Sequence, residues 1–344
     1  MLSVASPWVI ASAPSAPKWL CPPPEYEPLL RSIIGGLFAE GLMPPGSAID
    51  AGANAGEESC YYAERQPQRI VHAVEPLAAN IPRIRRWSSR LPNLRVMRGG
   101  LGSVSRVVLD DRASGNRTTS GLGAQIEGIG SMRGVDDSLA DAPGAIRVHR
   151  LDDLFAPGGA WHGERLGFAH FDVEGGEADV LRGGMETIER DRPVFTVETF
   201  VHNHANLTRA LLGLLQQLSY RPYLVEEQCG LPVDCRNLLC VPRERLPSFK
   251  RSPTLDLASS TGRLVAVTEA SISSHAYAAA CAPGGECCKG GPENRGFVRG
   301  WWKTDCCASG CVKRWLATLV GASASAPHAH RQWADRSGTR SGLF

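Results

Sequence analysis

The chain has 344 residues, of which 43% are hydrophobic and 21% are charged, and its formal net charge is +2. This composition is that of an ordinary globular protein, and a net charge so close to zero argues against a nucleic-acid partner. No run of apolar residues approaches the roughly 18 that a membrane span needs, so we expect no membrane span.

The first 24 residues end in three consecutive prolines, which indicate a stiff segment and a domain boundary. This segment lacks the basic start and the uninterrupted apolar core of a secretory signal. We therefore expect residues 1–24 to be a disordered or targeting-like segment and the protein to be cytoplasmic, with targeting to an organelle left open.

Residues 25–245 alternate between apolar residues at helical spacing and short apolar runs, and we expect one domain there. Helices are predicted over residues 25–43, 57–65, 78–90, 177–190 and 207–218, and a short helix or a turn over residues 151–155. Strands are predicted over residues 48–51, 70–74, 94–97, 104–109, 146–149, 166–172, 193–197, 221–225 and 237–241. This alternation, closed by an antiparallel pair, predicts an α/β fold with a doubly wound, mostly parallel sheet and helices on both faces. The stretch 111–144 interrupts it, and we interpret this stretch as a long loop on the ligand side and a candidate substrate lid.

The eleven cysteines fall into two sets. Five are scattered over the first 240 residues and are expected to be reduced thiols. The other six crowd between Cys281 and Cys311, within a basic extension over residues 246–344. Adjacent cysteine pairs do not have the spacing of a zinc ribbon, so no metal site is predicted. A small disulfide knot, a poorly ordered metal-binding tract and a sequence with no fold all remain open for these cysteines, and the Ala-, Ser- and Gly-rich end of the extension favours disorder.

A glycine turn and a following acid organise the first half of the domain. Residues 50–56 read Asp-Ala-Gly-Ala-Asn-Ala-Gly, and the next predicted strand is followed by Glu75. In a parallel sheet, this arrangement forms a nucleoside pocket in which the acid accepts hydrogen bonds from ribose hydroxyls. The third glycine of a dinucleotide motif is missing, and Glu57 and Glu58 at the start of the helix would repel a pyrophosphate. The pattern therefore favours S-adenosylmethionine, which has no phosphate, over NAD.

The chain resembles the FkbM-type methyltransferases over about residues 45–243. The likeness rests on the glycine turn, on Ala-Val-Glu-Pro at 73–76, and above all on Phe-Asp-Val-Glu-Gly-Gly-Glu-Ala-Asp-Val-Leu-Arg-Gly-Gly at 171–184. Arg-Pro-Val-Phe-Thr-Val-Glu at 192–198 and Arg-Asn-Leu-Leu-Cys-Val-Pro at 236–242 also look like that family. The resemblance implies a Rossmann-like class I methyltransferase with a seven-stranded sheet and S-adenosylmethionine as the methyl donor. His170 stands where the family commonly has a Lys.

Methyl transfer is an in-line displacement from a sulfonium, so the protein must position the acceptor oxygen and accept its proton. We expect Gly52 and Gly56 to let the backbone reach the methionine part of the cofactor, and Asp50 to hold its ammonium group. Glu75 is expected to bind the ribose. The full set of expected cofactor-binding residues is Asp50, Gly52, Asn54, Gly56, Glu75, Gly100 and Asp172.

The expected catalytic residues lie at the ends of two later strands. Asp172 and Glu198 are predicted to line the acceptor pocket. His170 is a third candidate, because imidazole titrates near neutral pH, although a neutral packed histidine is the favoured alternative. Glu174 is a further candidate base, and both it and Glu177 have capping of the following helix as an open alternative.

The sequence therefore predicts an S-adenosylmethionine-dependent methyltransferase that acts on a hydroxyl of a small molecule or a glycan. The alternative is a catalytically inactive binding protein that keeps the methyltransferase fold. The pattern does not identify the acceptor or the oligomeric state.

Overall fold

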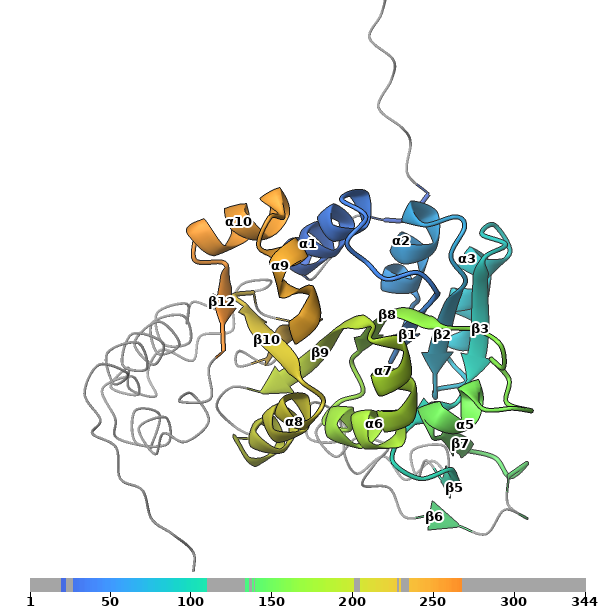
Figure 1. Ribbon diagram of the computed structural model, residues 1–344. Helices are drawn as coiled ribbons and strands as arrows, with labels where there is room; N and C mark the ends of the chain where they lie inside the picture. The colour runs from blue at the N-terminus through green and yellow to red at the C-terminus, as the bar shows by residue number, and fades with distance from the viewer. Residues whose placement is uncertain are drawn as a thin grey trace, which may run out of the picture. The chain divides into compact units, whose positions relative to one another are not determined.

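The structure is a computed structural model that describes residues 20–22, 27–109, 134–135, 138, 140–200, 205–227, 229 and 235–267 (Figure 1). Most of the expected lid at 111–144 lies outside these residues. So do the six crowded cysteines and nearly all of the N-terminal segment.

The main sheet of the described residues has eight strands in the order β12-β10-β11-β9-β8-β1-β2-β3. Its strands are β1 (Ser47–Ala51), β2 (Val71–Glu75), β3 (Leu94–Arg98), β8 (Leu166–Phe171), β9 (Val194–Phe200), β10 (Tyr220–Val225), β11 (Cys235–Pro242) and β12 (Leu264–Ala266). The run from β3 to β9 is parallel throughout. Strands β11, β10 and β12 add antiparallel pairs at one edge. The expected doubly wound sheet with a terminal antiparallel hairpin is therefore confirmed, with β12 as an eighth strand.

A second, smaller sheet has the order β4-β7-β5-β6. Its strands are β4 (Gly100–Leu101), β5 (Arg106–Leu109), β6 (Gly134–Val135) and β7 (Ala145–His149). Strand β4 begins two residues after β3 ends, so the small sheet starts close to the end of β3 in the main sheet.

Helices cover both faces of the main sheet (Figure 1). One face carries α1 (Pro28–Ala39), α2 (Glu57–Arg65), α3 (Ile81–Ser88), α9 (Leu246–Phe249) and α10 (Pro253–Ser260). The other carries α5 (Leu151–Phe155), α6 (Glu177–Gly183), α7 (Met185–Asp191) and α8 (Ala205–Gln217). A short 3₁₀ turn spans Arg243–Arg245. Apolar residues at helical spacing on α1, such as Ile33 and Leu37, are fully buried in one core cluster with Phe168 of β8, which is what the apolar periodicity predicts.

The single helix expected over residues 177–190 is two helices in the structure, with Gly184 between α6 and α7. A Cβ at Gly184 would lie 2.7 Å from the Leu151 side chain. The chain therefore approaches α5 closely at this point, and the interruption allows that approach.

The compact unit ends at Val267 and not at the expected boundary of 245. Two contacts extend it. Strand β12 pairs with β10. Glu40, after α1, accepts hydrogen bonds from the Ser252 hydroxyl and from the Thr254 backbone amide, the latter at 3.0 Å, and so fixes the start of α10. Residues 246–267 thus belong to the folded domain, and the expectation that they form part of the extension is wrong.

The expectation of five reduced thiols in the first 240 residues is also wrong for four of them. Cys21 pairs with Cys60, and Cys229 pairs with Cys235, in two disulfides. Cys240 is free and buried in β11.

Candidate functional site

The glycine turn after β1 lies against the ends of two neighbouring strands. Gly52 and Gly56 have positive φ, at 85° and 78°. The backbone amide of Gly52 donates to the Val74 carbonyl of β2 at 2.9 Å. A Cβ on Gly52 would lie 1.7 Å from the carbonyl oxygen of Asp172. Only glycine fits there, and the ends of β1, β2 and β8 meet at this residue.

Glu75, the last residue of β2, is buried and accepts three hydrogen bonds. Its Oε2 accepts from the Asn54 backbone amide at 2.8 Å, and its Oε1 accepts from the Leu77 amide at 2.8 Å and from the Asn80 side chain at 3.2 Å. Glu75 therefore fixes the glycine turn through Asn54. A carboxylate has about four acceptor positions, so at least one remains for a ligand hydroxyl.

Asp50 lies in β1, two residues before Gly52, and is 1% exposed. The Ser59 hydroxyl of α2 donates to it. Burial and the nearby carboxylates of Glu58 and Asp172 together raise the pKa of Asp50 to about 7, against the lowering effect of the Ser59 hydrogen bond. The carboxyl is thus poised between its neutral and ionised forms near neutral pH.

Gly100, the expected adenine neighbour, is buried at the start of β4. The preceding amide, of Gly99, donates to the backbone carbonyl of Glu75 at 3.1 Å. The structure therefore brings Gly100 close to the end of β2, where Glu75 lies.

A second turn follows β8 and carries three carboxyl groups. Glu174 has a positive φ of 58° and Gly175 one of 95°. Oε1 of Glu177, in the first turn of α6, accepts from the amides of Val173 and Gly175 at 3.0 and 3.1 Å. Glu177 therefore fixes this turn by binding its backbone, and through the turn it positions Asp172 and Glu174.

The carboxyl groups of this second turn repel one another. Burial and the charge of Glu75 together raise the pKa of Asp172 to about 6, against a lowering effect of the neighbouring Glu198 carboxyl. Burial and the charge of Asp172 raise the pKa of Glu177 to about 7 and that of Glu174 to about 8. A group of acids that resist ionisation favours a cationic ligand, because a nearby positive charge stabilises their ionised forms.

Glu198 of β9 faces the same group and lines a pocket. It is 5% exposed, and burial followed by the charges of Asp172 and Glu177 raises its pKa well above the usual value. Oε2 of Glu198 is buried with no hydrogen-bond partner among the described residues. The lining residues of this pocket are Gly175, Glu177, Ala178, Glu198, Thr199, Leu207, Thr208 and Leu211.

His170 lies inside β8, 3% exposed, and its Nδ1 lies 2.7 Å from the Thr196 hydroxyl of the neighbouring strand. Burial lowers the pKa of His170 to about 4. The ring is neutral at physiological pH, and its contact with Thr196 is typical of a packed histidine.

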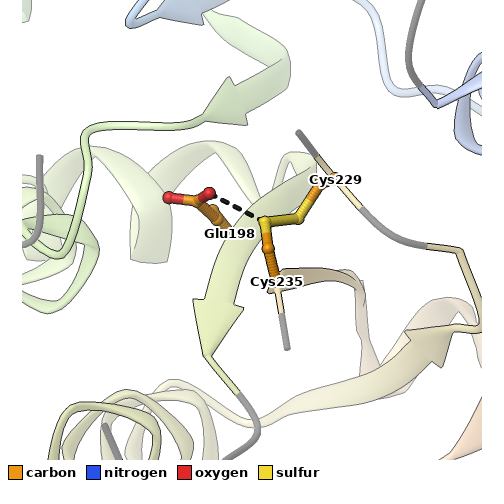
Figure 2. A group of neighbouring side chains, drawn as sticks. All are labelled: Glu198, Cys229 and Cys235. Carbon is orange, nitrogen blue, oxygen red and sulfur yellow. Dashed lines mark hydrogen bonds between the residues drawn. A yellow bond between two sulfur atoms is a disulfide. The ribbon is translucent and has the colours of Figure 1, made fainter. Parts of the chain in front are cut away.

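Two groups near Glu198 were not expected from the sequence. Sγ of Cys235 lies 2.9 Å from Oε1 of Glu198, as Figure 2 shows. Glu27, just before α1, accepts a hydrogen bond from Asn237 of β11, and burial followed by the charge of Asp172 raises its pKa to about 9. Cys235 and Asn237 lie two residues apart on β11, so both face the side of the sheet that carries Glu198.

The ends of β1, β2, β8 and β9 thus form a site with a glycine turn, an acid that fixes the turn, and a group of carboxyls beside a pocket. On a sheet whose parallel core is extended by an antiparallel hairpin, these features define a Rossmann-like class I methyltransferase.

The comparisons with known proteins give the family. Residues 50–222 match the methyltransferase FkbM domain. The chain belongs to the FkbM methyltransferase family.

Individual relatives share little sequence identity with this chain. The 2-O-methyltransferase NoeI of Sinorhizobium fredii is 23% identical over 184 residues, which cover 46% of this chain and 73% of that protein. The crystal structure of the methyltransferase FkbM from Methylobacillus flagellatus matches with 17% identity and a TM-score of 0.37, over 60% of this chain and 47% of that one. The Aeropyrum pernix fibrillarin, in complex with natively bound S-adenosyl-L-methionine, matches with 9% identity and a TM-score of 0.34, over 62% of this chain and 73% of that one. This chain therefore spans about half the length of the Methylobacillus protein. No helix of the described residues is long and apolar enough to cross a membrane.

Proposed function

We propose that the protein transfers a methyl group from S-adenosylmethionine to a hydroxyl oxygen of a small molecule or a glycan. The observation that carries this proposal is the convergence of Gly52, Glu75 and Asp172 at the ends of three neighbouring strands. The donor set fits the cofactor: Glu75 has an acceptor position left for a ribose hydroxyl, and the carboxyls of Asp50 and Asp172 suit an ammonium and a sulfonium.

Each residue has a part in this proposal. The backbone around Gly52 and Gly56 would lie against the methionine part of the cofactor, Glu75 would hold the ribose, and Gly100 would lie near the adenine. When bound, the cofactor supplies an electrophilic methyl carbon. The two positive charges of its methionine part would ionise Asp172, and this ionisation would make the site electrostatically complementary.

The acceptor would enter the pocket lined by Glu198. Thr199 and Thr208 contact each other through their hydroxyls at 2.9 Å in the pocket wall, and Leu207 and Leu211 make part of that wall apolar. Such a mixed lining fits a sugar-like or similarly amphipathic molecule. Asp172 or Glu198, once ionised, would accept the hydroxyl proton. The name of the NoeI relative, a 2-O-methyltransferase, supports an oxygen acceptor.

Titration calorimetry of the full chain tests the cofactor. We expect binding of S-adenosylmethionine and S-adenosylhomocysteine and no binding of NAD, and binding of NAD alone would refute the proposal. A panel of sugars and small alcohols, assayed by release of S-adenosylhomocysteine, then tests transfer. Tight cofactor binding without turnover on any acceptor would favour the inactive binding protein.

A further inference from the structure

The Cys229–Cys235 disulfide contacts a carboxyl group of the proposed acceptor pocket. Sγ of Cys235 lies 2.9 Å from Oε1 of Glu198, and Figure 2 shows the carboxyl group turned toward the sulfur. A sulfur in a disulfide carries no hydrogen, so this contact is a hydrogen bond when the Glu198 carboxyl is protonated and its O–H donates. The raised pKa of Glu198, due first to burial and then to Asp172, agrees with a neutral carboxyl.

We propose that Cys229 and Cys235 form a redox-active pair that takes a dithiol reductant, with the Glu198 carboxyl as the proton donor to the Cys235 sulfur. The geometry gives the direction of the reaction. Both cysteines are buried, but Cys229 keeps 4% of its surface exposed and Cys235 none, so we assign the attack of the reductant to Cys229. The sulfur that leaves is then the one beside Glu198.

Reduction takes two successive thiol–disulfide exchanges. One thiolate of the reductant attacks Sγ of Cys229, the disulfide breaks, and Cys235 leaves as a thiolate that takes the proton of Glu198. The second thiol of the reductant displaces Cys229, which receives that thiol's proton, and the reductant departs as a disulfide. Two electrons pass to the protein. Glu198 remains as a carboxylate, and the new Cys235 S–H can donate to it.

Reduction of the disulfide changes how readily Glu198 ionises. Asp172 and Glu174 from the turn after β8 and Glu177 from α6 all disfavour its ionised form. The Cys235 S–H favours that form. The reduced protein therefore holds Glu198 more readily as a carboxylate. If the proposed methyl transfer is correct, the reduced protein is the form whose pocket carries a base at lower pH.

The two cysteines can be followed separately from the others. Cleavage after arginine, which spares Arg221 because Pro222 follows it, places Cys229 and Cys235 in one peptide, residues 210–236, without any other cysteine. Cys240 falls in the next peptide. Native full-length protein is incubated with dithiothreitol, sampled over time and alkylated, and the mass of this peptide reports the fraction reduced.

We expect the wild-type pair to be reduced in the native protein, and Glu198→Gln to slow its reduction at least tenfold, since general acids contribute about 10²–10⁴-fold. The Cys21–Cys60 disulfide is the internal control, and Glu198→Gln should not change its rate. Glu75→Gln is the matched variant and should leave this rate unchanged, because Glu75 is similarly buried, at 3% exposed, and its charge is not among those that raise the pKa of Glu198. If Glu198→Gln unfolds the chain, the pH dependence of the wild-type reduction rate serves as the test instead. The rate is divided by the concentration of dithiothreitol thiolate at each pH, and we expect this quotient to fall as Glu198 loses its proton.

Three results overturn the proposal. The 210–236 peptide stays unalkylated until the protein is denatured, or Glu198→Gln reacts at the wild-type rate, or the reduced pair holds zinc by metal analysis and so acts as a ligand set with Glu198. None of these results depends on methyl transfer. A chain that binds no S-adenosylmethionine but passes this test would refute the proposed function alone.

Discussion

Gly52 offers a sharp test of the site geometry, because the same chain contains a matched glycine. Gly52 and Gly158 have nearly the same positive φ, 85° and 86°. A Cβ on Gly52 would lie 1.7 Å from the carbonyl oxygen of Asp172, whereas a Cβ on Gly158 would meet nothing within 4 Å. The substitutions Gly52→Ala and Gly158→Ala therefore share the backbone penalty and differ in the collision.

The backbone penalty is about 1–2 kcal/mol for a non-glycine residue in the left-handed region. Overpacking adds about 1–3 kcal/mol when the surroundings must shift. The Asp172 carbonyl must move away from β1, which strains the bond from the Asp172 amide to the Ala51 carbonyl, now 2.9 Å long. We expect Gly158→Ala to lower the free energy of unfolding by about 1–2 kcal/mol and Gly52→Ala by about 2–5 kcal/mol.

Urea denaturation of both variants measures these differences, and calorimetric titration with S-adenosylmethionine measures binding. Gly52→Ala should lose at least tenfold in affinity, because it displaces Asp172, while Gly158→Ala should bind as the wild type does. Equal stabilities and equal affinities for the two variants would refute the claim that β1 and β8 meet at Gly52.

Four further predictions concern the acids and His170. Glu75→Gln should lower the free energy of unfolding by about 1–3 kcal/mol, because an amide NH₂ would face a buried backbone N–H. It should also weaken S-adenosylmethionine binding. An unchanged unfolding free energy in urea and an unchanged affinity in calorimetry would contradict the role of Glu75. Affinity for S-adenosylmethionine should rise between about pH 6 and about pH 8, as Asp172 and Glu174 ionise at about 6 and about 8, and calorimetry across that range would show a flat profile if these acids do not face the cofactor. Over the same range the melting temperature of the ligand-free protein should fall, because a carboxyl whose pKa is raised by folding contributes stability at low pH that is lost as pH rises through the folded pKa. His170→Gln should reduce kcat less than tenfold and leave the pH profile of kcat unchanged, since the ring is already neutral; loss of a titration step would restore His170 as a base.

Much of the fold followed from local sequence patterns. The helix expected over 57–65 is α2, residue for residue, and the short helix or turn expected over 151–155 is the helix α5. In both, acids occupy the first turn, where they suit the helix dipole. The β12 strand could not be predicted in the same way. It has three residues, and its stability comes from pairing with β10 rather than from its own apolar pattern.

The candidate site was likewise predictable only in part. Residues at the end of a strand, such as Glu75 and Asp172, could be placed at one edge of the sheet because strand ends in a parallel sheet share an edge. Roles that depend on which side chains meet were not accessible. Glu75 shows this well, since its bond to the Asn54 amide depends on the register between β1 and β2.

The contact between Glu198 and Cys235 is the clearest case of information that only the register supplies. In the antiparallel pair of β9 and β11, Glu198 lies opposite Asn237, and Cys235 lies opposite Phe200. Glu198 and Cys235 are therefore diagonal neighbours on one face, a separation that long side chains bridge. In the sequence the two residues are 37 positions apart, and each taken alone indicates something ordinary: an acid at a strand end and one scattered cysteine. A carboxyl buried between a sulfur on one side and other carboxyls on the other is protonated or ionised according to those neighbours. The oxidation state of the cysteine pair therefore belongs in any account of how this site handles protons.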